Sequence, residues 1–266
     1  MKNSEKPIGI FDSGLGGLTV AKAINDLLPA ENLIYFGDTA RLPYGTKSPE
    51  TVKKFSLEIT EFLVSKNIKM LVIACNTSSS YALDIISETV KIPVIGVILP
   101  GVIKAIRMTK NNNIGVIGTT ATINSNVYSN LIRKYKSDCK VFSIACPLFV
   151  PLIEEGWINK KVTNEIIKEY LSPLKEAKID TLILGCTHYP LLKNKINLFF
   201  NKRVRIIDSA KSTAEFVRKV LIEKKIINKE NKKATLNFYV SDLPYKFSEL
   251  GSQFFKKDIS AVRVDL

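Results

Sequence analysis

Long apolar runs are missing from this sequence. No stretch approaches the roughly 20 consecutive apolar residues of a membrane-spanning helix, and residues 1–14, "MKNSEKPIGIFDSG", lead into an expected strand without the apolar core of a signal peptide. Four cysteines in 266 residues are too few for a disulfide scaffold, and neither CxxC nor paired Cys/His metal spacing occurs. We therefore expect a cytoplasmic protein with reduced thiols, no membrane partner and no metal site.

Acidic residues are in deficit, with 25 Asp and Glu against 39 Lys and Arg, which gives a formal net charge of +14. Such an excess can indicate a nucleic-acid partner, because Lys and Arg release counterions from phosphates. Here the excess is nearly all lysine, it is spread along the chain, and no basic stripe is interleaved with aromatic residues. Nucleic-acid binding is therefore not expected as a main function.

What the sequence does contain is a regular alternation of short Ile- and Val-rich runs with amphipathic stretches of helical length. This pattern is typical of βαβ units and a parallel sheet, so we expect an α/β fold. A chain of 266 residues that is 45% hydrophobic is long enough for a large core. The expected strands are residues 8–14, 33–39, 70–77, 93–98, 114–122, 141–147, 181–187 and 205–209.

The strand pattern occurs twice. The last four strands begin 106 to 112 residues after the first four, taken in order. We therefore expect two similar parallel-sheet α/β domains that face each other across a cleft with pseudo-twofold symmetry. The first domain is expected to comprise residues 1–97 and 210–266, and the second residues 98–209. Within 210–266 we expect a helix over 212–225 and a polar turn over 228–233, followed by the segments 235–242 and 259–266. We expect this remainder to pack back onto the first domain.

Two of the four cysteines occupy equivalent places in this repeat. Cys75 and Cys186 each follow the third strand of their set and precede an expected helix, and ligands bind outside the carboxyl ends of parallel strands. A helix N-terminus favours a thiolate, so these two thiols are candidates for acid–base chemistry. Cys139 and Cys146 are expected to be small buried apolar residues.

The stretch "FDSGLGGLTV" (11–20) places glycines between a strand and a helix, as a dinucleotide-binding turn does. Its third glycine would fall at Thr19, and Asp38 only partly replaces the ribose-binding acid, so nucleotide binding is not favoured. A tight turn that opens a helix explains the glycines without a ligand. It does not explain Asp12 and Ser13, which precede them and could accept a proton or hold an ammonium group.

The sequence has a single histidine, His188, two residues after Cys186. A lone histidine is usually structural, yet here it could hold or exchange the proton of that thiol, because its unperturbed pKa lies close to neutral pH. Glu154 and Glu155 follow another strand end, where they either start a solvated helix or turn one carboxylate toward the site. A zinc site built on Cys186 and His188 is disfavoured, because Cys-x-His is not a usual metal pair.

Taken together, the motifs "FDSGLGG", "GDTARLPYG", "IACNTSS", "ACPLFVPLIEEG" and "LGCTHYP" resemble those of the glutamate racemases, cofactor-independent enzymes that supply D-glutamate for bacterial peptidoglycan. The resemblance extends in order over nearly the whole chain, with no departure at a motif position. Only a few residues precede the first strand, so we expect no N-terminal extension of the kind associated in some members with activation by a cell-wall precursor.

The resemblance implies specific roles. Cys75 would deprotonate D-glutamate and Cys186 would deprotonate L-glutamate, with Asp12 helping Cys75, and His188 and Glu154 supporting Cys186. Asp38 would support the site without touching the substrate, and no PLP, metal or nucleotide cofactor is implied. The implied substrate contacts are Asp12, Ser13, Tyr44, Gly45, Asn76, Thr77, Thr119, Thr122, Thr187 and His188.

Two other functions remain open from the sequence. A related cysteine-pair aspartate or hydantoin racemase would share the two-thiol chemistry, although "GDTARLPYG" argues against it. An amino-acid-binding protein with inert thiols would be stabilised by its ligand without exchanging the Cα proton. The oligomeric state also stays open, a homodimer included, as does a secondary contact with a DNA-handling enzyme.

Overall fold

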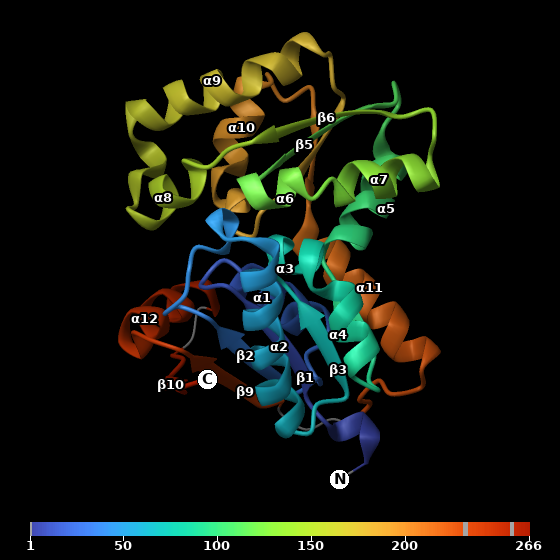
Figure 1. Ribbon diagram of the computed structural model, residues 1–266, viewed down its shortest axis with the longest axis vertical. Helices are drawn as coiled ribbons and strands as arrows, with labels where there is room; N and C mark the ends of the chain where they lie inside the picture. Colours follow the sequence, from blue (N-terminus) through green and yellow to red (C-terminus); the bar gives the residue numbers. More distant parts are fainter. Residues whose placement is uncertain (1, 231–233, 256–257) are drawn as a thin grey trace. The chain divides into compact units, whose positions relative to one another are not determined.

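Two parallel β-sheets organise the chain, for which a computed structural model describes residues 2–230, 234–255 and 258–266 (Figure 1). Residues 231–233 of the expected polar turn lie outside the description. The chain divides into two compact units, Met1–Val97 with Ala210–Leu266, and Ile98–Ser209. The predicted class, α/β with two parallel-sheet domains, is confirmed.

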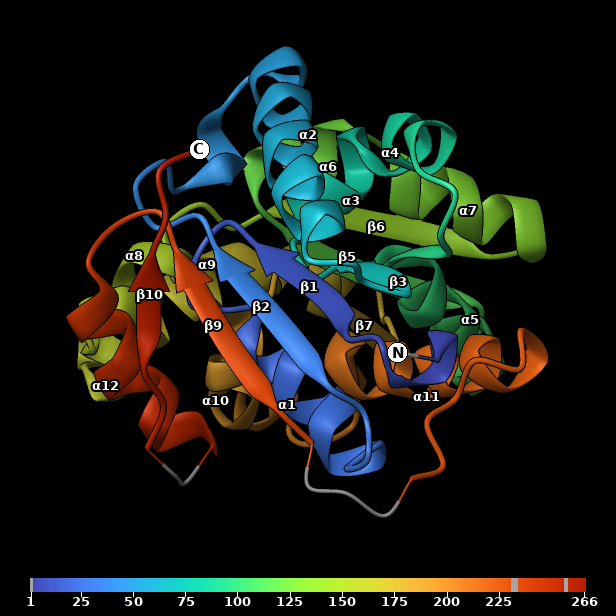
Figure 2. The ribbon, with the colours of Figure 1, turned by 90° about the horizontal axis from the view of Figure 1, so that it is seen from below.

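The sheet of the first unit has the strand order β10-β9-β2-β1-β3-β4. Figure 2 shows β10, β9, β2 and β1 side by side, with their arrows pointing the same way. Parallel strands that are covered on both faces read as continuous apolar runs, as Ile8–Asp12 and Leu33–Gly37 do. The strands are β1 (Ile8–Asp12), β2 (Leu33–Gly37), β3 (Met70–Ile73), β4 (Val94–Gly96), β9 (Leu236–Val240) and β10 (Ala261–Arg263).

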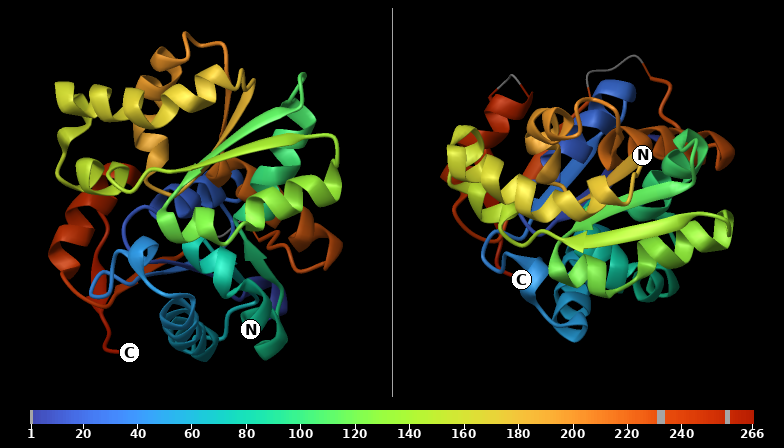
Figure 3. Two further views of the ribbon diagram at one scale, coloured as in Figure 1. Left: turned by 45° about the horizontal axis from the view of Figure 1, so that its top comes forward. Right: turned by 90° about the horizontal axis from the view of Figure 1, so that it is seen from above.

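The sheet of the second unit has the order β6-β5-β7-β8, and Figure 3 shows β5 and β6, in green, running side by side. In each unit the second strand lies on one side of the first, and the third and fourth lie on the other. The repeat seen in the sequence is therefore a repeat of topology. The strands are β5 (Asn113–Gly118), β6 (Lys140–Ala145), β7 (Thr181–Gly185) and β8 (Arg205–Asp208).

Helices cover both faces of each sheet. In the first unit, α1, α11 and α12 pack on the face that carries Ile8 and Ile10, and α2 and α4 pack on the face that carries Phe11. In the second, α8, α9 and α10 pack against Leu182 and Leu184, and α5 and α7 against Ile183. The α-helices of the described residues are α1 (Leu18–Leu27), α2 (Pro49–Ser65), α3 (Asn76–Tyr81), α4 (Leu83–Thr89), α5 (Ile98–Met108), α6 (Thr120–Asn124), α7 (Val127–Tyr135), α8 (Phe149–Glu154), α9 (Lys161–Glu176), α10 (Lys193–Phe199), α11 (Ser209–Glu223) and α12 (Pro244–Phe255). Short 3-10 helices are η1 (Asn3–Glu5), η2 (Tyr44–Thr46), η3 (Trp157–Asn159) and η4 (Tyr189–Leu192).

The chain passes between the units directly after the fourth strand of each set. Helix α5 follows β4 but packs on β7 and β8 of the second unit, and α11 follows β8 but packs on the sheet of the first. The helix that follows the fourth strand of each unit therefore packs on the sheet of the other unit: α5 on the second sheet and α11 on the first. This is why the first unit is built from two separated stretches of sequence.

All eight strands expected in 8–209 form, and all eight end earlier than predicted. The polar residues at the predicted ends belong to turns and helix starts, since α3 begins at Asn76 and α6 at Thr120. The predicted C-terminal helix also forms, and the segments 235–242 and 259–266 contain β9 and β10. Strand β9 pairs with β2, as expected for a segment that returns to the first unit. Among the described residues, no helix combines the length and apolar character needed to cross a membrane.

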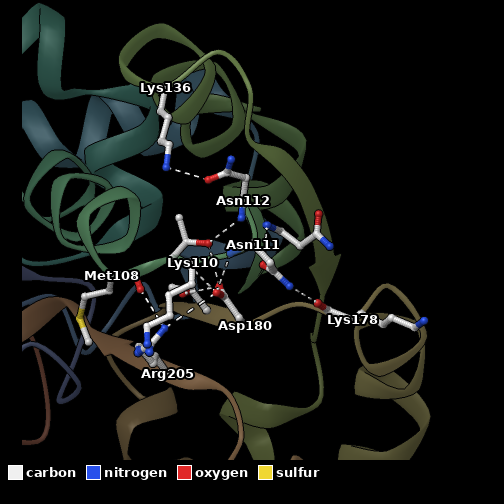
Figure 4. A network of polar contacts seen from close by, with 11 residues as sticks. Met108, Lys110, Asn111, Asn112, Lys136, Lys178, Asp180 and Arg205 are labelled. Atoms are coloured by element: carbon white, nitrogen blue, oxygen red, sulfur yellow. Dashed lines mark hydrogen bonds and ion pairs between the residues drawn. The ribbon is translucent and has the colours of Figure 1, made fainter.

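Asp180 joins the turn after α5 to the turn that leads into β7 (Figure 4). Its carboxylate accepts hydrogen bonds from Thr109 Oγ1 at 2.7 Å, Lys110 N at 2.5 Å and Asn111 N at 3.0 Å. Arg205 adds an ion pair at 3.8 Å. Burial alone would raise the pKa of Asp180, but the hydrogen bonds from Lys110 N, Thr109, Thr181 and Asn111 N together lower it below its usual value. The network holds the amino-terminal ends of the strands of this sheet, opposite to the carboxyl-terminal ends that carry the candidate site.

Candidate active site

Cys75 lies where β3 gives way to α3. Strand β3 ends at Ile73, Ala74 N still donates to Phe11 O at 2.8 Å, and Cys75 is the N-cap residue of α3. Its sulfur accepts a hydrogen bond from Ser78 N at 3.5 Å, and its thiol donates to Ser13 Oγ at 3.8 Å. Only 5% of Cys75 is exposed. The thiol is thus held by the ends of two neighbouring strands, β1 and β3.

Asp12 closes the glycine turn that follows β1. Its Oδ2 accepts hydrogen bonds from Gly14 N at 3.2 Å and from Gly17 N at 2.9 Å, and the side chain is fully buried. A Cβ at Gly17 would lie 2.4 Å from the Asp12 Cβ and 2.7 Å from the Tyr35 hydroxyl, so only glycine fits there. The turn therefore explains part of the role of Asp12 without a ligand.

The pKa of the Cys75 thiol is raised to about 12, chiefly by burial and further by the negative charge of Asp12. The Ser78 N–H, the Ser78 side chain and the Ser13 hydroxyl act in the opposite direction, because they stabilise the thiolate. From the sequence, the helix N-terminus is predicted to favour the thiolate. In the structure that effect is outweighed by burial and by Asp12.

The loop after β2 is organised by the buried carboxylate of Asp38. Oδ2 accepts hydrogen bonds from the Tyr44 hydroxyl and from Arg41 Nε, the latter at 2.7 Å, and Oδ1 accepts one from Ser241 Oγ at 2.8 Å. Burial raises the pKa of Tyr44 above its usual value, and the nearby Asp38 charge raises it further. The Tyr44 ring packs with Cys75 in one apolar cluster. Asp38 therefore fixes Tyr44, and the Tyr44 ring lies beside the thiol.

The other predicted contacts of this unit are close in sequence to these groups. Gly45 is buried in η2, directly after Tyr44. Asn76 and Thr77 form the first turn of α3, directly after Cys75, and each is 3% exposed. We call the following residues the Cys75 cluster: Asp12, Ser13, Asp38, Tyr44, Gly45, Cys75, Asn76 and Thr77.

Cys186 lies one residue beyond the end of β7 and is 7% exposed. Its sulfur is 3.9 Å from His188 Nδ1. The other ring nitrogen, Nε2, lies 3.2 Å from Oε1 of Glu154, which is the last residue of α8 and is exposed at the surface. The imidazole of His188 thus lies between the Glu154 carboxylate and the Cys186 thiol, with one ring nitrogen near each. Glu155, the other predicted carboxylate, is the C-cap residue of α8 and is also exposed.

One prediction about Cys186 is wrong. The residue does not cap a helix, because the 3-10 helix η4 begins only at Tyr189, with His188 as its N-cap residue, and α10 begins at Lys193. Pro190 at the start of η4 and the turn over Cys186–His188 delay the helix. The polar neighbour of Cys186 is therefore an imidazole rather than a helix N-terminus.

Three threonines complete this second group. Gly118, the last residue of β5, pairs with Gly185, the last residue of β7, so Thr119 and Cys186 leave the sheet side by side. Thr119 caps α6, and its Oγ1 accepts from Thr122 N at 3.2 Å and donates to Thr122 Oγ1 at 2.9 Å. Thr187 is 8% exposed. We call the following residues the Cys186 cluster: Thr119, Thr122, Glu154, Cys186, Thr187 and His188.

The register of the two sheets places the two thiols at equivalent positions. Ile8 pairs with Met70, and Cys75 follows Met70 by five residues; Ile114 pairs with Thr181, and Cys186 follows Thr181 by five residues. The equivalence therefore holds in hydrogen-bonding register as well as in sequence spacing.

The other two cysteines are buried, as predicted. Cys139 packs among apolar residues of α5 and α7, and Cys146 is fully buried with its thiol 3.8 Å from Ile144 O. Burial raises the pKa of both thiols. The nearby Cys186 raises the pKa of Cys146 further. The two cysteines belong to one apolar cluster, and the sequence did not indicate that they lie close together.

Several residues that hold the Cys75 cluster in place were not predicted from the sequence. Arg41 binds Asp38 and Glu58 and lies 4.1 Å above the Phe55 ring, and Ser241 binds Asp38 from the C-terminal segment. A signal for Ser241 was available, because "YVSD" ends a strand in small polar residues as the other site strands do. No group of three or more His, Cys, Asp or Glu residues suited to a metal occurs in the described part of the chain.

Comparison with known proteins gives concordant results. Residues 8–217 match the model of the Asp/Glu/hydantoin racemase family. The chain is 50% identical over 249 residues to the glutamate racemase of Geobacter metallireducens, which covers 94% of this chain and 92% of that protein. A crystal structure of glutamate racemase from Francisella tularensis in complex with D-glutamate is similar with a TM-score of 0.92 and 42% identity, covering 98% of both chains. A glutamate racemase isoform from Bacillus anthracis is similar with a TM-score of 0.96 and 41% identity, covering 99% of this chain and 98% of that one.

Proposed function

The chain belongs to the Asp/Glu/hydantoin racemase family, and on this basis we propose that it interconverts L- and D-glutamate through two cysteine thiols. The observation that carries the proposal is the register-equivalent position of Cys75 and Cys186 in a chain that is 50% identical to a glutamate racemase. The D-glutamate so formed supplies peptidoglycan synthesis.

Racemisation removes the Cα proton from one face of the amino acid and returns a proton to the other. Two acid–base groups must therefore flank one carbon, one as thiolate and the other as thiol, and their roles exchange with the direction of the reaction. In this proposal Cys75 takes the proton from D-glutamate and Cys186 takes it from L-glutamate. The proposal requires that the two clusters face one bound substrate.

Asp12 couples substrate binding to the ionisation of Cys75. Its negative charge disfavours the Cys75 thiolate in the free protein. When the α-ammonium group of glutamate lies beside Asp12, it compensates that charge, and the Ser78 N–H remains a donor to the sulfur. The Ser13 hydroxyl accepts from the thiol and can turn its own proton toward the sulfur once the thiolate forms. Bound substrate thus lowers the free-energy cost of forming the base that attacks it.

His188 and Glu154 serve the other thiol. Glu154 holds His188 Nε2, which leaves Nδ1 directed at Cys186. An imidazole in this position can take the thiol proton and hold it during the reaction. Because Glu154 touches His188 and not the thiol, it acts by orienting the ring.

The polar residues of both clusters bind the two carboxylates. The Tyr44 hydroxyl already donates to Asp38 and does not serve the substrate in this proposal. The main-chain N–H groups of Tyr44 and Gly45 begin η2, where N–H groups have no partner within the helix, and they are the donors that we assign to the side-chain carboxylate. Asn76, Thr77, Thr187 and the Thr119–Thr122 pair supply donors for the α-carboxylate. Aspartate has a shorter side chain, so we expect it to leave donors unpaired and to turn over at least tenfold more slowly than glutamate, at roughly 1–3 kcal/mol for each unpaired buried donor.

Proton exchange in deuterated water tests the function directly. The purified protein with no added cofactor should incorporate one deuterium at Cα of either enantiomer while optical rotation decays to zero. Cys75→Ala and Cys186→Ala should each abolish racemisation, and Cys139→Ser is the matched control that should retain it. Loss of activity on chelation, restored only by a metal, would contradict the proposal.

We place the reaction in the cytoplasm, where thiols stay reduced. A homodimer is the assembly we propose, and light scattering of the purified protein distinguishes it from a monomer.

A further inference from the structure

Ser241 links the C-terminal part of the chain to the loop after β2. It follows β9, the strand that pairs with β2, and its N–H donates to Gly37 O at 3.2 Å. Its hydroxyl donates to Asp38 Oδ1 at 2.8 Å and accepts from Ala40 N at 2.9 Å. One side chain thus bridges a buried carboxylate and the main chain two residues further on.

The next residue reinforces this link. Asp242 N donates to Thr39 Oγ1 at 2.9 Å, and the Thr39 hydroxyl donates to Asp242 O. Residues 37–40 are therefore bonded at successive positions to two residues that lie about two hundred positions later in the sequence. The loop conformation depends on this late segment.

Asp38 transmits the constraint to the substrate-binding end of the loop. The carboxylate is fully buried, and besides Ser241 it accepts from the Tyr44 hydroxyl and Arg41 Nε. A buried carboxylate is oriented by its donors, so losing one on Oδ1 frees the group to rotate away from those on Oδ2. Tyr44 would then lose its anchor.

We propose that Ser241 is a positioning residue for the side-chain carboxylate of glutamate: by fixing Asp38 it fixes Tyr44, and with it the N–H groups of Tyr44 and Gly45. The inference rests on the function proposed above and adds to it a residue that touches no substrate. Its effect falls on a part of glutamate that does not invert, so both enantiomers must be affected alike.

Ser241→Ala should raise KM about threefold to tenfold for L- and D-glutamate equally, the loss expected for one hydrogen bond, with kcat within about twofold of the parent. Ser241→Thr keeps the hydroxyl, so its KM should stay at the parent value. Ser252→Ala is the matched control, because the Ser252 hydroxyl also bridges two main-chain positions of the C-terminal segment, donating to Ser248 O at 2.7 Å and accepting from Ile259 N at 3.0 Å.

Tyr44→Phe tests the route of the effect. It removes the hydroxyl from Asp38 and should raise KM by itself, and adding Ser241→Ala should then raise KM little further, because both act through one carboxylate. Additive effects in the double variant, or a KM change as large in Ser252→Ala, would overturn the inference. So would an unchanged KM in Ser241→Ala.

Calorimetric titration with D-glutamate separates this inference from the proposed function. If the parent binds glutamate without racemising it, the proposed function is wrong, while a Ser241-dependent dissociation constant still supports the positioning role. If the parent racemises glutamate and all serine variants bind it equally, the positioning role alone is wrong.

Discussion

At the scale of single residues, opposing influences set the ionisation of Cys75. Burial and Asp12 raise the pKa of the thiol to about 12, while Ser13 and Ser78 favour the thiolate. Free protein near neutral pH therefore holds Cys75 almost entirely as thiol. In the proposed mechanism the base therefore forms when substrate binds, and the thiol form is less open to alkylation and oxidation.

Asp12→Asn should make Cys75 more reactive and the protein less active. Removing the negative charge lowers the pKa of Cys75, so more thiolate is present at a given pH and alkylation of Cys75 becomes several-fold faster. Racemisation should fall by at least tenfold, because the substrate ammonium loses its partner. Peptide-resolved mass spectrometry after iodoacetamide treatment gives the first rate, and circular dichroism gives the second. Slower alkylation in Asp12→Asn would show that Asp12 does not oppose the thiolate.

Ser78→Ala should act on the same thiol in the opposite direction. The Ser78 side chain is fully buried and favours the Cys75 thiolate. Its loss should raise the pKa of Cys75 further, slow alkylation, and slow deprotonation of D-glutamate more than that of L-glutamate. Ser80→Ala is the control, because the Ser80 hydroxyl donates to Asn76 O at 2.9 Å within the same helix. Equal alkylation rates in the two variants would contradict this assignment.

At the scale of elements, the sheet of the second unit depends on how its two edges are fixed. Cys186 lies at the carboxyl-terminal end of β7, and Asp180 holds the amino-terminal end of the same strand. Asp180 joins the turn after α5 to the start of β7, so it fixes the strand that presents the thiol from the other end (Figure 4).

Asp180→Ala should destabilise the protein by roughly 2 kcal/mol, since several donors lose a charged acceptor. Asp180 has a lowered pKa, so its contribution is complete above the ordinary carboxyl pKa of about 4 and is lost as pH falls through the lowered value. Thermal unfolding should therefore show a large difference between parent and variant at neutral pH and a smaller one in strong acid. Asp138→Ala, which removes an exposed acceptor of a single Asn112 bond, is the control. A difference independent of pH would mean that the ionised carboxylate is not responsible.

At the scale of the whole molecule, the first four strands of each unit share one spatial order, and each unit presents one thiol at the same register position. A repeat of this kind suits a reaction that needs two equivalent groups on opposite faces of one carbon. The equivalence stops at the neighbours of the thiols: Cys75 has Asp12 and two serines, whereas Cys186 has His188 and Glu154.

If each thiol serves one face of the substrate, the two cysteine variants should process opposite enantiomers of a suitable analogue. Cys75→Ser and Cys186→Ser should each lose racemisation by several orders of magnitude, because a serine hydroxyl ionises too weakly to replace the thiol. An analogue with a leaving group at Cβ needs only one deprotonation to eliminate. Cys75→Ser should release keto acid from the L-like isomer and Cys186→Ser from the D-like isomer. Elimination of both isomers by one variant would refute the two-thiol mechanism.

The sequence by itself determined the strands, their repeat and the positions of Cys75 and Cys186. These follow from local rules, because buried parallel strands require short apolar runs, and functional groups must stand at their carboxyl ends. Only the tertiary structure showed that Cys186 follows a turn rather than capping a helix, and that burial and Asp12 outweigh the helix N-terminus at Cys75. It alone brought Ser241 to Asp38, across about two hundred residues. Desolvation and hydrogen bonds between distant segments depend on which surfaces pack together, and no local pattern of residues specifies that.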